Sequence, residues 1–382
     1  MKKILWIAMN AGYDTVAHAG GKNENFYLKG LKKANDDVRV LSFALENERE
    51  KLDLDAYHIE NEIKYYPNNV SKLFKMVDMY RYAKKAVKRY KKEGYEPEVV
   101  ILQWTLMAFL IGYMKRIFPN AKYIIAEEDV SFLAYKRMAT YYTNWVKKFV
   151  FSCVYSLVKC LELKAIKKSD RTICSNKKDV KLLMDEGLST ELVTSWTPFY
   201  QDLSKTEYLG ENRDVIFYGA MGRAENEMSA IWFIENVLPL VKDTGIRFVI
   251  VGGGVKDNLR TFASDQVKIE GFVENLEPYF SKSLCLAAPL VLGAGIKIKV
   301  LECMSAGLPV VTNEIGIEGI PAVDGKEYMH ATTPQEYADA IKKLVKDKQL
   351  GQNISHSAKK FIKEEFDLET SLRQFIAWIE NM

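Results

Sequence analysis

The sequence contains few residues of the kinds that bind transition metals or form disulfide bonds. Among 382 residues there are five cysteines, none in CxxC spacing, and four histidines, none in an HxxxH pair. These spacings exclude a zinc-finger site and a disulfide framework. We therefore expect no metal centre and a protein of the reducing cytoplasm.

Long apolar runs, short repeats and low-complexity tracts are also absent. No run reaches the roughly 18 apolar residues that a membrane-spanning helix needs, so we expect no such helix. The apolar segment 4–9 follows two lysines, as in a secretory signal, but it is short and leads into a glycine turn. It predicts a buried first strand.

The length predicts two domains, and charge is divided unevenly between the halves. Residues 1–200 contain 34 Lys and Arg against 24 Asp and Glu, a net charge of +10, whereas residues 201–382 contain 20 against 26, a net charge of −6. The basic half could face an anionic surface, either lipid head groups or nucleic acid. A solvated, lysine-rich face is the simpler explanation of the charge alone.

Short apolar runs alternate with helical patterns along the whole chain. The expected strands are 4–9, 38–43, 99–103, 123–126, 171–174, 215–218, 248–251, 267–270, 284–287 and 310–313. The helices expected between and after them include 24–33, 71–92, 144–168, 228–238, 299–305 and 368–379. This alternation predicts an α/β protein with two Rossmann-like, doubly wound parallel-sheet domains facing a cleft.

Doubly wound sheets bind ligands beyond the carboxyl ends of their strands. We expect an N-terminal domain over residues 1–197, a C-terminal domain over 198–365, and a last helix, 366–382, that returns to the first domain. The segment 195–210, with Pro198 and mixed polar residues, is the expected linker.

The stretch GAGIKIKVLECMSAGLPVV, residues 293–311, combines features that favour phosphate binding. Two glycines let the backbone turn and approach a ligand. A helix predicted from Ile298 presents free N–H groups and the positive end of its dipole, which attract phosphate. Lys297 and Lys299 add full charges at the same place.

Glu302 lies one turn inside this predicted helix. A carboxylate there suits a neighbouring diol that donates two hydrogen bonds, and a nucleotide sugar offers that geometry, with its diphosphate at the helix start and its ribose one turn on. Glu302 by itself could simply stabilise the helix start. Together with the glycines and lysines, it predicts a nucleotide-sugar site.

Several segments resemble retaining family 4 glycosyltransferases, which have the GT-B fold. The segment 293–320 resembles the family's donor-binding signature, and 217–239 resembles the strand, glycine loop and helix that open its second domain. Residues 248–254 resemble its next strand and glycine turn, 269–280 its base-contacting loop, and 18–31 the glycine loop after its first strand. The likeness covers both domains and is strongest over 215–320.

The resemblance implies a role for each matching residue. Glu302 would hold the ribose, Lys297 and its two successors the diphosphate, and Phe272 with its successor the base, by main-chain contacts. A glycine loop in the first domain would approach the diphosphate. Phe272 could instead pack at a strand end, the glycine pair could form a simple loop, and Arg223 could be solvated. The implied nucleotide-sugar-binding residues are Gly20, Gly21, Gly219, Arg223, Phe272, Val273, Gly295, Lys297, Ile298, Lys299 and Glu302.

The chain departs from the family pattern at two places. Ala294 stands where the family usually has a second glutamate, eight residues before the ribose-binding one, although the branch with GxGIKxKVLE commonly lacks that acid. The arginine and lysine that are frequent on the loop after Gly219 are also missing, and Arg223, Lys297 and Lys299 are the available substitutes.

Three consecutive acids, Glu127, Glu128 and Asp129, follow the predicted strand 123–126, where many family members carry a histidine. Clustered carboxylates raise one another's pKa, so one of them could orient or deprotonate an acceptor hydroxyl. We predict Glu128 and Lys297 as the catalytic residues. For Asp129 we expect a helix cap.

The apolar, lysine-edged segment 144–168 admits two interpretations. It could dock the protein on anionic lipid, but core packing is the usual role of such a stripe and the one we expect.

From the resemblance we expect a metal-independent, retaining hexosyltransferase of surface polysaccharide or glycoconjugate synthesis. Its donor would be a nucleotide sugar, UDP-linked, and its acceptor a glycan or polyprenyl-linked hydroxyl. We expect no other cofactor and no nucleic-acid partner, with peripheral membrane contact through the first domain as a further expectation. The alternative is a catalytically silent GT-B subunit that binds a partner or glycan.

Overall fold

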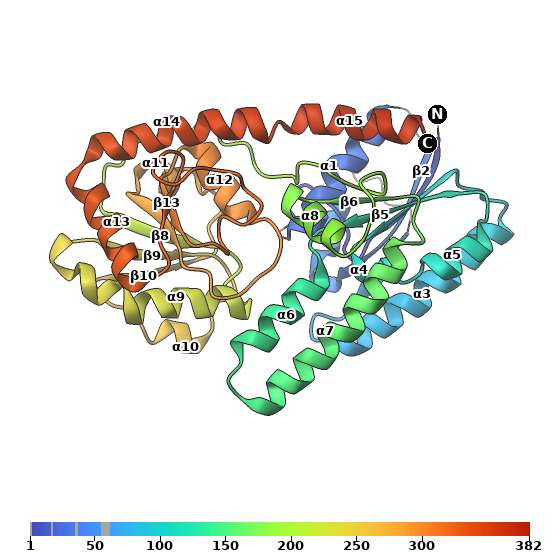
Figure 1. Ribbon diagram of the computed structural model, residues 1–382, viewed down its shortest axis with the longest axis horizontal. Helices are drawn as coiled ribbons and strands as arrows, with labels where there is room; N and C mark the ends of the chain where they lie inside the picture. The colour runs from blue at the N-terminus through green and yellow to red at the C-terminus, as the bar shows by residue number, and fades with distance from the viewer. Residues whose placement is uncertain (1, 17, 35–36, 55–61) are drawn as a thin grey trace. The chain divides into compact units, whose positions relative to one another are not determined.

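The computed structural model describes residues 2–16, 18–34, 37–54 and 62–382 (Figure 1). The chain divides into two compact units, Met1–Phe199 with Leu368–Met382, and Tyr200–Asp367. We call them the N-terminal and the C-terminal domain. Each is built around one parallel β-sheet, so the predicted pair of Rossmann-like domains is confirmed.

The N-terminal sheet has seven strands in the order β3-β2-β1-β4-β5-β6-β7, and every neighbouring pair is parallel. The order reverses direction at β1 and β4, which are neighbours. Its strands are β1 (Lys3–Ile7), β2 (Asp37–Leu45), β3 (Glu62–Tyr66), β4 (Val99–Gln103), β5 (Lys122–Glu127), β6 (Arg171–Cys174) and β7 (Val193–Ser195).

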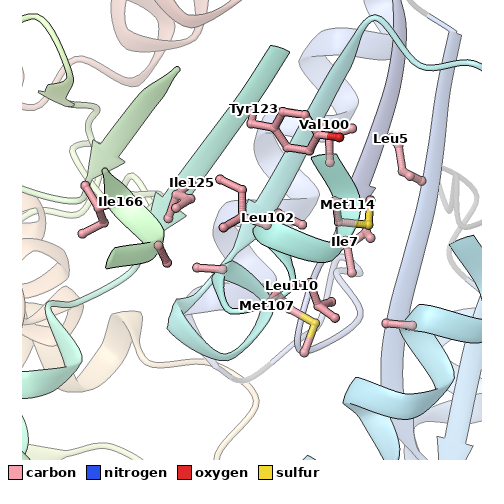
Figure 2. Packing of buried hydrophobic residues seen from close by; sticks show 14 of the residues in the cluster. Leu5, Ile7, Val100, Leu102, Met107, Leu110, Met114, Tyr123, Ile125 and Ile166 are labelled. Carbon is pink, nitrogen blue, oxygen red and sulfur yellow. The ribbon is translucent and has the colours of Figure 1, made fainter. Parts of the chain in front are cut away.

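Helices cover both faces of this sheet, and a hydrophobic core lies on each. Because successive side chains of a strand point to opposite faces, Leu5 and Ile7 of β1 enter one buried cluster while Ile4 and Trp6 enter the other. Figure 2 shows the first cluster, where side chains of β1, β4 and β5 meet those of neighbouring helices. Because both faces of the sheet are buried, strands such as β1 and β4 consist largely of consecutive apolar residues.

The N-terminal domain includes α15, a helix from the C-terminal segment Leu368–Met382. Helix α15 packs on α1, and Phe375 of α15 makes edge contacts with the rings of Trp6 and Tyr27. The helices are α1 (Ala19–Lys33), η1 (Glu46–Glu48), α2 (Arg49–Leu54), α3 (Lys72–Lys92), α4 (Thr105–Ala108), α5 (Ile111–Ile117), α6 (Ser131–Tyr141), α7 (Trp145–Ile166), α8 (Lys177–Asp185) and α15 (Leu368–Glu380).

The C-terminal sheet has six strands in the order β10-β9-β8-β11-β12-β13, again all parallel. Its order reverses at the neighbours β8 and β11. The strands are β8 (Asp214–Tyr218), β9 (Arg247–Val251), β10 (Val267–Gly271), β11 (Cys285–Ala288), β12 (Val310–Thr312) and β13 (Met329–His330). The helices are α9 (Ala224–Asn236), η2 (Leu238–Thr244), α10 (Asp257–Arg260), α11 (Glu277–Lys282), α12 (Ile298–Ala306), α13 (Pro334–Lys346) and α14 (Lys348–Glu365).

The segment expected to pack in the core, 144–168, forms α7, and the expectation of core packing is wrong for most of it. The fully buried residues of α7 are Glu162, Ala165 and Ile166, all in its last turns. The Trp145 side chain at its start is 77% exposed. Within the described parts of the chain, no helix combines the length and the apolar character needed to cross a bilayer.

Candidate functional site

Each sheet has one point at which the strand order changes direction, and loops diverge there to leave a crevice at the carboxyl ends of the strands. In the C-terminal domain this point lies between β8 and β11, and in the N-terminal domain between β1 and β4. Most residues predicted for donor binding in the second domain follow β8 or β11, and the predicted acid cluster of the first lies at the end of β5, next to β4. Phe272 and Val273 follow the edge strand β10 instead.

Helix α12 begins where the sequence predicts, with Lys297 as its N-cap residue and Ile298 as its first residue. The loop before it contains Gly293 at φ 141° and Gly295 at φ 69°. Only glycine adopts such backbone angles without strain. The glycines are therefore required by the loop that brings the chain from β11 to the start of α12, whether or not a ligand approaches them.

Lys299 extends from α12 to the residues that follow β8. Its Nζ donates a hydrogen bond of 2.8 Å to Oδ1 of Asn226 and lies 4.4 Å from the ring centroid of Phe217. A Cβ atom on Gly219 would lie 2.9 Å from that Nζ, so glycine leaves the space that the ammonium group occupies. Burial, together with the positive charges of Arg223 and Lys297, lowers the pKa of Lys299 to about 7.

The Lys297 side chain is held by the loop before α12 and by an acidic residue farther along the chain. Its Nζ donates to the carbonyl oxygen of Gly295 and lies 3.7 Å from Oε2 of Glu318, and both side chains of this ion pair are largely buried. Glu318 was not among the predicted residues, although this glutamate lies in the segment 293–320 that resembles the donor signature. Glu318 neutralises the charge of Lys297, whereas the second lysine, Lys299, has a neutral hydrogen-bond partner. An anion that binds next to Lys299 would therefore balance its positive charge.

Glu302 points to the end of β8 rather than to solvent, and the residue is 5% exposed. Its Oε2 accepts a 2.5 Å hydrogen bond from the Tyr218 hydroxyl, and its Oε1 accepts one of 3.2 Å from the backbone N–H of Gln201. Burial and the neighbouring carboxylate raise the pKa of Tyr218, so this hydroxyl remains a donor. The carboxylate is therefore fixed in orientation, and its oxygens can accept more than one hydrogen bond each.

Three further predicted residues lie on loops after β8 and β10. Phe272 follows β10 and is 76% exposed, so the strand-end packing considered for it is excluded. Val273 is partly buried beside it. Arg223 is the N-cap residue of α9, and its side chain is 69% exposed and ion-paired with Glu225.

In the N-terminal domain, Gly20 and Gly21 do not form the expected loop. They lie in the first turn of α1, which begins directly after the loop that follows β1. The ring of His18 caps this helix by accepting a 2.9 Å hydrogen bond from the backbone N–H of Gly21. Burial lowers the pKa of His18, which favours the neutral ring that can accept this bond.

Glu128 is held by two amide side chains at the carboxyl end of the sheet. Gln103, the last residue of β4, donates 2.6 Å to Oε1, and Asn23 of α1 donates 2.5 Å to Oε2. The same amide group of Gln103 donates 2.9 Å to the carbonyl oxygen of Gly20. Burial, with a smaller contribution from the charge of Asp129, raises the pKa of Glu128 to about 7 against the opposing effect of the two hydrogen bonds.

Trp104 follows Gln103 in a backbone conformation that side chains rarely adopt. Among the residues the structure describes, it is the one non-glycine residue with positive φ, at 74°. Its ring lies over Gly20, where a Cβ atom would come within 3.0 Å of it. Strained residues of this kind concentrate at functional sites, so Trp104 marks the same end of the sheet as Glu128.

The other two acids of the cluster have different surroundings. Glu127 is buried and accepts a 2.9 Å hydrogen bond from the Thr105 hydroxyl, and burial together with the nearby charge of Glu162 raises its pKa. The expectation that Asp129 caps the following helix is wrong. Val130 is the N-cap residue of α6, and the Glu162 carboxylate accepts the N–H groups of the first two residues, at 2.8 and 3.0 Å.

The structure thus brings residues of α12 that were predicted to bind the donor together with Gly219, and places Glu128 with Gly20 in the other domain. Sequence reasoning missed the side chains that hold these groups in place. Only long-range contacts reveal them, although a glutamine at the end of an apolar strand was a signal for one of them. The residues missed are Asn23, Gln103, Trp104, Tyr218, Asn226 and Glu318.

Comparison with known sequences bears on the C-terminal domain. Residues 212–347 match the family model described as Glycosyl transferases group 1. A relative from Klebsiella pneumoniae, named as an uncharacterized 44.6 kDa protein in the cps region, is 27% identical over 167 residues, which cover 41% of this chain and 43% of the relative. The chain therefore matches less than half the length of that relative.

Solved structures match the whole chain at low sequence identity. Sucrose-phosphate synthase from Thermosynechococcus elongatus matches with a TM-score of 0.74 and 14% identity, over 100% of this chain and 99% of that one. The Anabaena protein HepE in complex with UDP matches with a TM-score of 0.70 and 14% identity, over 100% of both chains. A glycosyltransferase from Rickettsia africae matches with a TM-score of 0.66 and 12% identity, over 99% and 97%. The chain has the GT-B fold, and residues 212–347 carry the sequence pattern of group 1 glycosyltransferases.

Proposed function

We propose that the protein is a retaining glycosyltransferase that transfers a hexose from a UDP-linked sugar to a hydroxyl group of a glycan or a lipid-linked acceptor. The GT-B fold and the group 1 pattern support the activity. HepE, which has been solved with UDP and with UDP-glucose, supports the choice of donor. The name of the Klebsiella relative, which refers to the cps region, supports a role in polysaccharide assembly.

One observation carries the donor site. Two lysines converge at the start of α12, and a fixed carboxylate, Glu302, lies one turn inside the helix. In the proposed complex the diphosphate lies against Lys297, Lys299 and the N–H groups of the first turn, and the ribose hydroxyls donate to Glu302. The base lies beside Phe272 and Val273, whose main chain it contacts.

These residues also fit the proposed chemistry. As the bond between the sugar C1 and the diphosphate oxygen breaks, negative charge grows on the diphosphate, and the two ammonium groups stabilise it. The acceptor oxygen forms the new bond to C1 on the same face, and its proton passes to the departing diphosphate. Glu128 orients the acceptor by accepting a hydrogen bond from a second hydroxyl group of it, not from the one that attacks. Lys297 and Lys299 supply the positive charge that a metal ion supplies elsewhere, so we expect full activity in EDTA.

A thermal-shift screen against UDP, GDP and dTDP sugars tests the donor site, because a ligand that binds only the folded protein raises its stability. We expect UDP sugars to raise the melting temperature of the wild type and Glu302→Ala to abolish that shift. An undiminished shift in the variant would contradict the ribose assignment.

A second candidate function is a GT-B subunit that binds a sugar nucleotide or glycan without catalysis. Ala294 in place of the family's usual acid, and the exposed, paired state of Arg223, favour it. Hydrolysis and transfer assays with a panel of UDP sugars separate the two. Binding without turnover of any donor would favour the silent subunit, and turnover of one donor would exclude it.

A further inference from the structure

Helices α6 and α7 form an antiparallel hairpin of the N-terminal domain, and the outer face of α7 is apolar and exposed (Figure 1). Side chains exposed along that face include Trp145 at 77%, Phe149 at 65% and Leu157 at 61%. They recur at the spacing of one helical face, and no charged residue interrupts them over four turns. The residues of this outer face are Trp145, Val146, Phe149, Val150, Cys153, Leu157, Cys160 and Leu161.

The hairpin does not need this face for its own stability. The opposite face of α7 packs on α6 and on the core of the domain, where Phe151 stacks on Tyr142 and Tyr155 meets the edge of Phe132. At its far end, Glu162 fixes the start of α6 through two backbone hydrogen bonds. The outer face is thus an apolar surface on a helix that is already held by contacts on its other side.

Charge determines which partner suits this face. Residues 131–168 contain eight Lys and Arg and one acid, the buried Glu162, so the hairpin has a net charge of +7. A second copy of the chain docked face to face would bring two such charges together, which disfavours self-association. An anionic lipid surface attracts them.

The composition of the face also fits a bilayer. Tryptophan and tyrosine favour the interface between water and lipid, and Trp145 and Tyr141 lie at the turn of the hairpin with Lys147 and Lys148 next to them. Amphipathic helices of this kind lie in the plane of the interface with their apolar side buried at the boundary of the head groups.

We propose that the outer face of the α6–α7 hairpin docks the protein on an anionic lipid bilayer. Trp145 and Phe149 insert at the level of the head groups, and Lys147 and Lys148 contact lipid phosphates. This inference goes beyond the proposed transferase activity and does not depend on it. The hairpin begins four residues after β5, at whose carboxyl end Glu128 lies, so docking would tether to lipid the domain that contains the residue proposed to orient the acceptor.

Vesicle co-sedimentation of the full chain without any nucleotide tests this proposal. The wild type should bind vesicles of phosphatidylglycerol and phosphatidylcholine, bind pure phosphatidylcholine far more weakly, and dissociate at high salt. The variants Trp145→Ala/Phe149→Ala and Lys147→Ala/Lys148→Ala should each weaken binding roughly tenfold or more. Both change exposed residues, and circular dichroism checks that each variant is folded.

Matched controls come from the C-terminal domain. Val323→Ala removes an exposed apolar side chain, and Lys343→Ala/Lys346→Ala removes two exposed charges from α13. Neither should change vesicle binding. Equal loss in these controls, no binding of the wild type to anionic vesicles, or wild-type binding by Trp145→Ala/Phe149→Ala would each overturn the proposal. So would a dimer in light scattering that this last variant converts to monomers, since the face would then join two copies.

The outer face carries its own reporters. Cys153 and Cys160 are exposed on it, while the other three cysteines are buried. A polarity-sensitive fluorophore on these thiols should shift to the blue when anionic vesicles are added, and Cys153→Ser/Cys160→Ser should abolish the signal. A label that stays in water while the protein sediments with vesicles would show that another face docks. Donor binding, measured without vesicles, is a separate readout, so failure of one proposal leaves the other intact.

Discussion

The Nζ atom of Lys299 lies 2.8 Å from the side-chain oxygen of Asn226, a neutral partner. The pKa of this lysine is lowered to about 7, because burial and the charges of Arg223 and Lys297 disfavour its protonated form. An anion bound at the start of α12 would favour that form and raise the pKa again. If the diphosphate binds there as proposed, the site gains a proton on binding.

The first prediction is that donor binding weakens as the pH rises above 7. Below that pH Lys299 is already charged, and above it the lysine must take up a proton on binding, so affinity falls by up to about tenfold per pH unit until the pKa of the complex is reached. Titration calorimetry with a UDP sugar, whose diphosphate does not titrate in this range, measures the effect. Lys299→Met should bind more weakly and without this dependence. A flat profile in the wild type would contradict the placement of the diphosphate.

The second prediction concerns the hydrogen bond from Tyr218 to Glu302. Tyr218→Phe removes a donor from a buried carboxylate, which should lower stability by about 1–3 kcal/mol and weaken UDP-sugar binding by roughly three- to tenfold, because Glu302 is no longer fixed. Tyr208→Phe is the matched control, since its hydroxyl donates 2.9 Å to the backbone carbonyl of Leu284. It should lower the melting temperature and leave the affinity unchanged. Equal affinities in both variants would show that the hydrogen bond serves stability alone.

The third prediction is that transfer activity rises through about pH 7 at saturating donor. The pKa of Glu128 is raised to about 7, and its ionised form accepts a hydrogen bond from an acceptor hydroxyl other than the one that attacks. Glu128→Gln should lose most of the activity, on the order of 100-fold, and the rise with pH. Glu127→Gln changes the neighbouring acid, which points to Thr105 instead, and should keep the wild-type profile. If the activity of Glu128→Gln still rises through pH 7, the titration of another group controls the pH dependence of the rate.

The fourth prediction concerns stability. Glu127 and Glu162 both have raised pKa values, chiefly through burial, and that of Glu162 is about 7. Their folded pKa values lie above those of the unfolded chain, so the folded state binds more protons and stability falls as the pH rises from about 4.5 to 7. Glu127→Gln removes one charge of the pair, so it should raise the melting temperature at pH 8 and change it little at pH 5. If the melting temperature of Glu127→Gln at pH 8 equals that of the wild type, burial of charge on Glu127 and Glu162 does not destabilise the folded state.

The sequence predicted most elements of both domains because their signals are local, but it did not predict the edge strands β3, β7 and β13. Apolar runs such as Ile4–Ile7 and the alternation with helical segments are properties of neighbouring residues. The start of α12 was predicted to within one residue, because the glycines, Lys297 and the helix-forming segment after them lie next to one another. The GT-B fold followed from that order of elements and from the resemblance of the donor signature.

The roles of α7 and of the first glycine pair could not be predicted in this way. The apolar residues of α7 have the pattern of a core helix, and whether such a face is covered depends on which other element reaches it. Gly20 and Gly21 suggested a loop, but His18 is the N-cap residue of α1, and the two glycines lie in the first turn of this helix.

The sequence by itself determined most of the strands and helices and their order along the chain, the position of the lysines at a helix start, and the acids at the end of β5, since each depends on consecutive residues. Only the tertiary structure decided that Gln103 and Asn23 hold Glu128, that Tyr218 fixes Glu302, and that Asn226 faces Lys299. The physical reason is that these partners come from separate strands and helices. Their hydrogen bonds exist only after burial of the apolar faces has brought the ends of those elements together.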